Sequence, residues 1–247
     1  MKKILAFCSI LFALPAFKSQ GQTIFLSEGK IEFEKKENLY SQLDEDNGWS
    51  ELQKKMMTKF KTTYFDLYFD QSKTVYRPGR ENPDNLKGWM GDGIAGENVV
   101  YSDLDSAQSI SQKKVFETYF LIKDSTRQIR WKLTDETRVI AGFNCRRANA
   151  IIMDTIYVVA FYTDEIISSG GPESFSGLPG MILGVALPHQ HLSWFATRVT
   201  AKTITPAELK PPVKGTKVTN SSLKTSLAER MQDWGKYKQR YLEAVLL

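Results

Sequence analysis

Short apolar or alternating segments, each bounded by polar residues, glycine or proline, make up most of the chain. This is the pattern of β-strands. The strands that we expect cover residues 29–35, 64–70, 74–76, 115–122, 129–133, 139–152, 156–163, 181–187 and 192–199. They follow one another at short spacing and without helical crossovers, which favours antiparallel pairing. Residues 181–187 are apolar at both odd and even positions, so this strand is expected to be buried on both faces.

Two segments have apolar residues at helical spacing instead. The first is residues 49–59, and the second is residues 221–245, where Ser221 or Ser222 is placed to cap the first turn. The prediction is a mainly β protein: a curved antiparallel sheet, shaped as an open half-barrel, with a short helix near the N-terminus and a C-terminal amphipathic helix. We expect a β domain over residues 22–205, a polar linker over 206–220, and a helix over 221–247 that packs on the same domain.

The first 21 residues have the features of a secretory signal peptide. Lys2 and Lys3 precede an apolar run over residues 4–14, and Ser19 and Gly21 stand at the −3 and −1 positions of a cleavage site. The apolar run is too short to span a membrane, which takes about 20 residues. We therefore expect export to the periplasm or to the periplasmic face of the outer membrane, with a mature chain that begins at Gln22.

Removal of this peptide changes the charge of the chain. The 247 residues carry a formal charge of +5, but residues 1–21 hold three lysines and no acid, so 30 basic residues face 28 acidic ones afterwards. A mature charge of +2 argues against a nucleic-acid partner. The mature chain contains no segment apolar enough for a transmembrane helix, and its single cysteine, Cys145, excludes an intramolecular disulfide.

Several blocks of the sequence resemble the GLPGLI family of Gram-negative bacteria. The signature block is Gly-Leu-Pro-Gly-Met-Ile-Leu at residues 177–183. It is preceded in the same order by Trp-Lys-Leu at 131–133, by residues 140–148 and 160–166, and by Gly-Pro-Glu-Ser-Phe at 171–175. Methionine at position 181 and phenylalanine at 161 depart from the family pattern but keep its apolar bulk.

The resemblance implies an exported envelope protein associated with outer-membrane transport systems, and it implies no catalytic residue. We therefore expect a non-enzymatic, periplasmic or outer-membrane-associated binding or assembly accessory of an envelope transport system, whose partner is an outer-membrane transport or assembly protein. One alternative is a periplasmic carrier of an apolar or lipid-like ligand. A second alternative is a metal-dependent hydrolase at His189 and His191. No cofactor is expected apart from that metal.

The signature block has the turn chemistry of a type II turn, because proline presets φ at the second position and glycine supplies a positive φ at the third. Such a turn either feeds a core strand or brings backbone against a ligand, since glycine allows close approach. The candidate ligand-binding residues on the second interpretation are Gly171, Pro172, Gly177, Leu178, Pro179 and Gly180.

The remaining candidates are the two histidines and the cysteine. His189 and His191 would share one face of a strand and could reach one metal, with Asp164, Glu165 and Glu173 as further ligands, but two ligands are too few for a zinc site. Cys145 precedes two arginines, whose charge can activate a thiol. A buried, inert thiol is the simpler interpretation.

Overall fold

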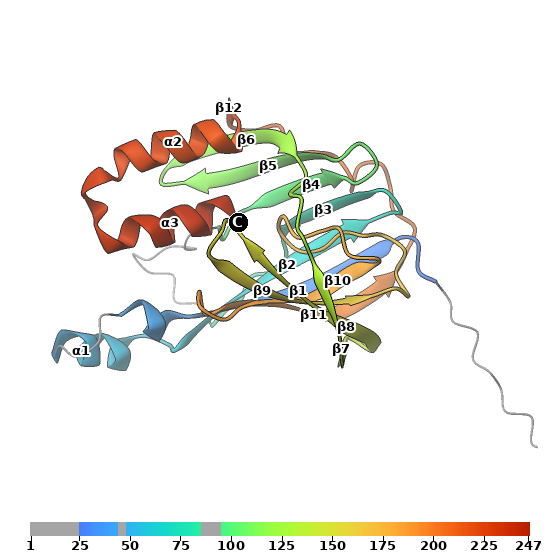
Figure 1. The fold of residues 1–247 in the computed structure, drawn as a ribbon, viewed down its shortest axis with the longest axis horizontal. Coiled ribbons are helices and arrows are strands. Elements are labelled where there is room, and N and C mark those ends of the chain that lie inside the picture. Colours follow the sequence, from blue (N-terminus) through green and yellow to red (C-terminus); the bar gives the residue numbers. More distant parts are fainter. Residues whose placement is uncertain (1–24, 44–47, 85–94) are drawn as a thin grey trace, which may run out of the picture.

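The computed structural model describes residues 25–43, 48–84 and 95–247, and the expected signal peptide therefore lies outside the described residues. The described part forms one 12-stranded sheet that does not close into a barrel, and three short helices (Figure 1). The strands are β1 (Gly29–Asn38), β2 (Phe60–Phe69), β3 (Lys73–Pro78), β4 (Val99–Asp103), β5 (Gln108–Val115), β6 (Thr118–Ser125), β7 (Lys132–Ile140), β8 (Phe143–Ile152), β9 (Ile156–Thr163), β10 (Met181–Leu187), β11 (Leu192–Ala201) and β12 (Thr216–Val218). The helices are α1 (Gly48–Met56), α2 (Asn220–Arg230) and α3 (Lys236–Leu246).

The sheet consists of two antiparallel meanders joined by the first strand. The strand order is β12-β6-β5-β4-β3-β2-β1-β11-β10-β9-β8-β7, and β12 alone pairs in parallel, with β6. Strands that are neighbours in the sheet are therefore also neighbours in sequence, except where β1 pairs with β11 and where β12 pairs with β6. The prediction of a mainly β, curved antiparallel sheet is confirmed.

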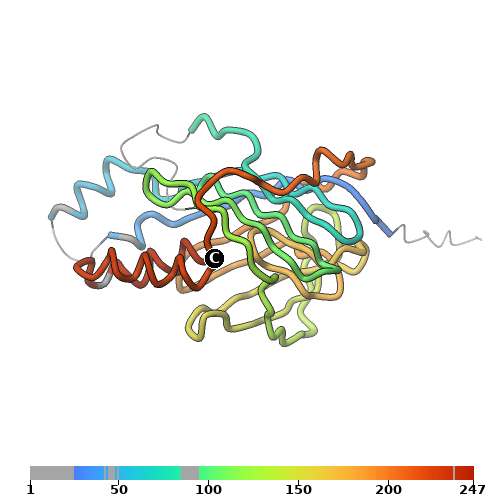
Figure 2. Tube along the Cα trace, turned by 90° about the horizontal axis from the view of Figure 1, so that it is seen from above, coloured from blue at the N-terminus to red at the C-terminus, as the bar shows by residue number. Residues whose placement is uncertain are grey.

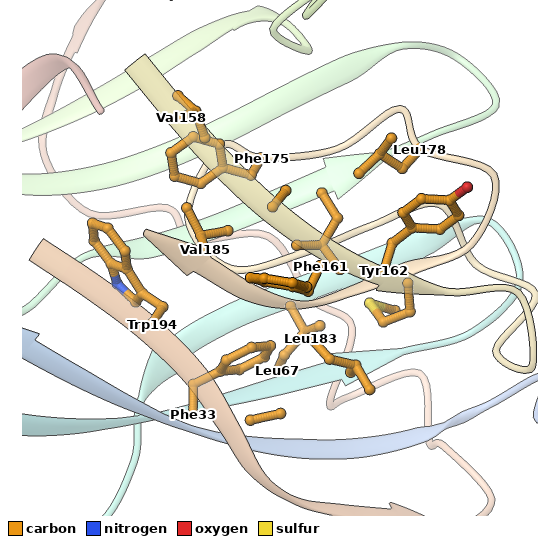
Figure 3. Close-up of a cluster of buried hydrophobic side chains, with 14 of the residues drawn as sticks. Phe33, Leu67, Val158, Phe161, Tyr162, Phe175, Leu178, Leu183, Val185 and Trp194 are labelled. Atoms are coloured by element: carbon orange, nitrogen blue, oxygen red, sulfur yellow. The ribbon is translucent and has the colours of Figure 1, made fainter. Parts of the chain in front are cut away.

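The sheet curls so that its two meanders share one core. Phe33 and Leu67, from β1 and β2, belong to the same buried cluster as Phe161 and Leu183, from β9 and β10 (Figure 3). Trp194 of β11, which is 1% exposed, completes this cluster. Burial of these large side chains supplies most of the driving force for folding.

A second, smaller core lies under the C-terminal helices. Leu223, Leu227 and Met231 pack with Val115 and Ile122 of strands β5 and β6. Helices α2 and α3 run side by side at this end of the sheet (Figures 1 and 2). None of the helices among the described residues has the length and apolarity needed to span a membrane.

Several local predictions differ from the structure. The strand expected over residues 129–133 begins only at Lys132, as β7. Residues 115–122 were expected to form one strand, but they contain the turn between β5 and β6, where Phe116 has a φ of 54°. The expected helix over 221–245 is two helices, because the chain reverses at Gly235, whose φ is 52°. The cap of α2 is Thr219, in a capping box with Ser222.

Candidate functional site

The segment between β9 and β10, residues 164–180, carries the first four residues of the signature block and folds back on the concave face of the sheet. Phe175 and Leu178 of this segment are 1% and 2% exposed and belong to the main core (Figure 3). Residues 126–131, which connect β6 to β7, run beside it: Trp131 Nε1 donates to the carbonyl oxygen of Ser176 at 2.9 Å. We call residues 164–180 the signature loop.

The turn at the end of the signature loop is tighter than a type II turn. The Gly180 N–H donates to the carbonyl oxygen of Leu178 at 2.7 Å, and the Met181 N–H donates instead to Ile166. This closes a three-residue γ-turn. Gly180 has the expected positive φ, at 134°, and a Cβ atom there would lie 2.1 Å from the carbonyl oxygen of Thr163. Glycine is therefore required at position 180 by protein packing.

The other signature candidates also contact protein. A Cβ atom on Gly171 would lie 2.7 Å from the carbonyl oxygen of Phe175, and Pro172 is buried beside it. Gly177 and Pro179 are the exposed members of the set. The six candidates therefore lie in one loop. The charged side chain that this loop buries belongs to another residue, Glu173.

Glu173 is a buried acid in a strained position. It is 3% exposed, and its φ of 51° is uncommon for any residue except glycine. One carboxylate oxygen, Oε2, accepts a hydrogen bond from Asn98 Nδ2 at 3.0 Å. The other oxygen, Oε1, has no hydrogen-bond partner among the described residues. Buried polar atoms are nearly always paired, so an unpaired carboxylate oxygen marks a place where a partner is expected.

Glu173 lines a pocket of about 350 Å³. We call this the α3 pocket, because helix α3 forms one wall. Strands β1 and β11, the turn between β10 and β11, and the signature loop form the others. The residues that line it are Lys35, Glu37, Ser41, Ala95, Glu173, His189, Gln190, His191, Leu192, Trp194, Gln239, Arg240, Glu243, Ala244 and Leu247.

Lys35 is the buried cation of the α3 pocket. It is 7% exposed, and its Nζ donates to the carbonyl oxygen of Ala95 at 3.4 Å, a long hydrogen bond. The ammonium also lies 5.3 Å from the centre of the Trp194 ring, within the range of a cation–π interaction. Burial of a charge with so few partners is costly.

The histidine pair lies in the pocket wall but not on a strand. His189 and His191 are exposed and belong to the turn between β10 and β11, where His191 has a φ of 54°. The expectation of one shared strand face is therefore wrong, because the strand ends at Leu187. Glu173 lines the same pocket as the two histidines, whereas Asp164 and Glu165 do not. Within the described residues, no group of three or more histidine, cysteine or acidic side chains is placed to hold a metal ion.

Helix α3 is tied to the sheet by cations at its C-terminal end. Lys113 Nζ donates to the carbonyl oxygen of Val245 at 2.9 Å, and Arg127 donates to that of Leu246 at 2.5 Å. Ser174 of the signature loop donates to the carbonyl oxygen of Leu247. The last carbonyl groups of a helix have no partner within it and carry its negative dipole end, so cations there are favourable.

Burial shifts the pKa values of two groups near Glu173, the Lys113 ammonium and the Tyr76 hydroxyl. Desolvation lowers the pKa of Lys113 to about 8, although the nearby Glu173 opposes the shift. Desolvation also raises the pKa of the Tyr76 hydroxyl well above its ordinary value, and the charge of Glu173 adds to that effect. Glu173 is thus close enough to act electrostatically on both groups.

Cys145 lies away from the pocket. It is fully buried on β8, and desolvation raises the pKa of its thiol to about 12. A thiol with that pKa is almost wholly protonated near neutral pH, which makes it a poor nucleophile.

Sequence reasoning missed Lys35 and Lys113, although the strand pattern contains the signal. Ile31, Phe33 and Lys35 have the same parity on β1, and all three are buried. Lys113 likewise precedes buried Val115 by two residues on β5. Because residues two apart on a strand share a face, a lysine in register with core residues indicates a buried cation.

Comparisons with known proteins support the fold and leave the activity open. A family model described as "Protein of unknown function (Porph_ging)" matches residues 150–184, which include the signature block, and this is consistent with a GLPGLI-like family. No curated protein matches the sequence.

Solved structures with a similar fold include PNGF-II. Two crystal forms of PNGF-II, in space groups C2 and P21, each match with a TM-score of 0.53 and 15% identity over 81% of this chain. The chain spans about a third of PNGF-II, 32% and 33% in the two forms. An uncharacterised conserved protein from Thermus thermophilus matches with a TM-score of 0.40 and 6% identity, over 78% of this chain and 90% of that one. At these identities, the likeness to PNGF-II concerns the fold alone.

Proposed function

We propose that this protein is an exported, non-catalytic binding protein of the cell envelope that takes a small polar ligand in the α3 pocket. The observation that carries the proposal is the buried carboxylate of Glu173, whose Oε1 has no partner among the described residues and which lines a pocket of ligand size. A ligand that donates a hydrogen bond to Oε1 would remove the cost of leaving it unpaired.

The lining of the α3 pocket favours a polar ligand over an apolar or lipid-like one. Lys35, Glu173 and Gln190 present charged or amide groups, and Gln190 Oε1 also lacks a partner within the described structure. Binding without catalysis is favoured because the nucleophile candidate, Cys145, lies outside the pocket and has a raised pKa.

Native mass spectrometry of the protein, purified from its natural source without denaturation, tests this proposal. We expect an added mass that is lost on denaturation. Glu173→Gln should reduce the occupied fraction strongly, and the exposed Glu229→Gln should not. A protein that carries no small molecule in any preparation, or one whose occupancy is the same in both variants, would contradict the proposal.

An exposed aromatic cluster supports a second candidate function, that of an assembly accessory. Phe116 stacks on Tyr241 with ring centres 5.2 Å apart and meets Trp234 edge to face at 5.8 Å. Phe116 is 46% exposed and Trp234 is 40% exposed. Exposed apolar groups that gather in this way are typical of contact surfaces.

Co-purification from envelope extracts tests the accessory function. An envelope protein retained by the unsubstituted chain should be lost in the double variant Phe116→Ser, Trp234→Ser. It should be kept by Ile151→Ser, because Ile151 is an exposed apolar residue on β8, outside the cluster. Equal retention by all three proteins would reject the cluster as a contact surface.

Export is the remaining part of the proposal, and it depends on the pattern of residues 1–21. Intact-mass measurement of the protein from the envelope fraction should give a chain that begins at Gln22. A full-length product in the cytoplasmic fraction would contradict both export and the proposed compartment.

A further inference from the structure

Two buried charges of opposite sign line the α3 pocket and do not neutralise each other. Lys35 and Glu173 are 7% and 3% exposed, and among the described side chains they form no ion pair with one another. Within the part of the chain that the structure describes, the Lys35 ammonium has one long hydrogen bond, to a carbonyl oxygen, and Glu173 keeps one carboxylate oxygen unpaired. An arrangement of this kind is unfavourable in an empty pocket, because buried charges are stable when they are paired.

The other buried cations nearby already have partners. Lys113 and Arg127 donate to the carbonyl oxygens of Val245 and Leu246 at the end of α3. Lys113 also interacts electrostatically with Glu173, but neither it nor Arg127 lines the pocket, whereas Lys35 does. The remaining charged groups of the lining, Glu37, Arg240 and Glu243, are partly exposed to solvent, which screens their charges.

We propose that the α3 pocket binds a compact zwitterion of the amino-acid type, a free amino acid or a short peptide. The ligand carboxylate would accept hydrogen bonds from Lys35 Nζ, and the ligand ammonium would donate to Glu173 Oε1. This inference rests on the proposed function and adds the chemical class of the ligand.

The choice of a zwitterion follows from the two charges taken together. An anionic ligand would pair with Lys35 and leave Glu173 unpaired, and a cationic ligand would do the reverse. A neutral polyol reaches both groups, but with bonds in which one partner is uncharged, and these are weaker than bonds between two ionised groups. A volume of about 350 Å³ is at the lower end for small-molecule pockets, which suits a ligand of this size.

Calorimetric titration with chemically blocked ligands tests the proposal on the unsubstituted protein. The probes are L-alanine, L-leucine, L-glutamine and L-alanyl-L-alanine, each beside its N-acetyl derivative, which lacks the ammonium, and its carboxamide, which lacks the carboxylate. At least one free zwitterion should bind, and each blocked form should bind at least tenfold more weakly. If no zwitterion binds, or if the blocked forms bind as well as the free ones, the proposal is overturned.

Variants assign each ligand group to its residue. Glu173→Gln should weaken binding of the free ligand at least tenfold and leave the affinity of the N-acetyl form unchanged. Lys35→Met should do the same for the free ligand while leaving the carboxamide unchanged. The matched controls are Lys36→Met, the exposed neighbour on β1, and Glu229→Gln, exposed on α2. If the affinity of the N-acetyl form falls as much as that of the free ligand in Glu173→Gln, the assignment is wrong.

A neutral probe separates this inference from the proposed function. If glucose binds, and Glu173→Gln weakens it while no zwitterion binds, then the pocket is a binding site and the zwitterion assignment is overturned. If neither glucose nor any zwitterion binds, and the purified protein carries no small molecule, the proposed function and this inference both fail.

Discussion

The concave side of the sheet is covered in two different ways. Over the main core the cover is the signature loop, whose Gly171 and Gly180 lie against backbone and whose Phe175 and Leu178 fill the space beneath. Over strands β5 and β6 the cover is the pair of helices α2 and α3. Apolar contacts and Lys113 of β5 join this pair to the sheet, and Arg127 joins it to the connection between β6 and β7. The α3 pocket lies where these two covers meet.

This difference between the two covers indicates where polar groups are available to bind a ligand. The signature loop packs so tightly at Gly171 and Gly180 that it leaves no room for a ligand there. The contact between loop and helix is made by polar groups that satisfy the end of α3, and some of the groups beside it, such as Glu173 Oε1, keep unused hydrogen-bonding capacity. We therefore expect the signature turn to contribute stability and the junction with α3 to bind the ligand.

The largest effect should come from the signature turn. Gly180→Ala should destabilise the fold by about 3 kcal/mol or more, since it adds a backbone clash with Thr163 to the strain of a positive φ. Gly142→Ala is the matched control, because Gly142 has a φ of 89° but open space around it in the described structure. It should cost about 1 kcal/mol. Urea unfolding measures both, and equal losses would show that packing against Thr163 is unimportant.

Loss of the tie between Arg127 and α3 should have the next largest effect. Arg127→Met removes the bonds to Leu246 and to Ser174 Oγ, and it should cost about 2–3 kcal/mol, as expected for charged hydrogen bonds. Hydrogen exchange should show that the amides of α3 lose protection, while those of the signature turn keep it. Lys224→Met, on the exposed face of α2, should change neither. Equal loss of protection in both covers would contradict their separate roles.

Lys113 should make stability depend on pH. Its pKa is lowered from 10.5 to about 8 on folding, so between pH 8 and 10 the unfolded chain binds more protons than the folded one, and stability rises with pH. The gain should be roughly 2 kcal/mol over this range, since one pKa unit corresponds to about 1.4 kcal/mol. The difference in unfolding free energy between the unsubstituted protein and Lys113→Met isolates this gain. A difference that stays constant with pH would show that Lys113 keeps its ordinary pKa.

The smallest effect should be seen at Cys145, which belongs to the main core. Its thiol is buried and its pKa is raised to about 12, so the folded protein should resist iodoacetamide at pH 8. Mass spectrometry of peptides should find Cys145 unmodified in the native state and fully modified in urea. Rapid labelling of the native protein would show that the core under the signature loop opens readily.

Much of the fold was predictable because local patterns agree with the final packing. The apolar runs 156–163 and 181–187 are strands β9 and β10 with the same bounds. Strands β4 and β5 were missed. Strand β4 has only five residues, Val-Val-Tyr-Ser-Asp, and β5 is rich in serine, glutamine and lysine, so that its burial depends on what the rest of the chain places against it. The reversal at Gly235 was hidden by apolar residues that keep helical spacing through the break.

The site was predictable only in part. The signature resemblance pointed to residues 171–180, and the loop does hold Glu173, but the sequence does not show that the glycines pack against backbone while the acid points inward. The histidines were placed on a strand that ends before them. Lys35 could have been identified from the alternation along β1, because it lies on the same face of the strand as Ile31 and Phe33. Its burial depends on what the rest of the fold packs against that face.

The most direct test of the account is hydrogen exchange of the protein with and without the small molecules that are released from natively purified material. Bound ligand should protect the amides of residues 189–194 and 239–247, the two segments that contribute most of the lining of the α3 pocket, and leave those of residues 177–180 unchanged. Protection confined to residues 177–180 would place the binding site at the signature turn and contradict the central claim.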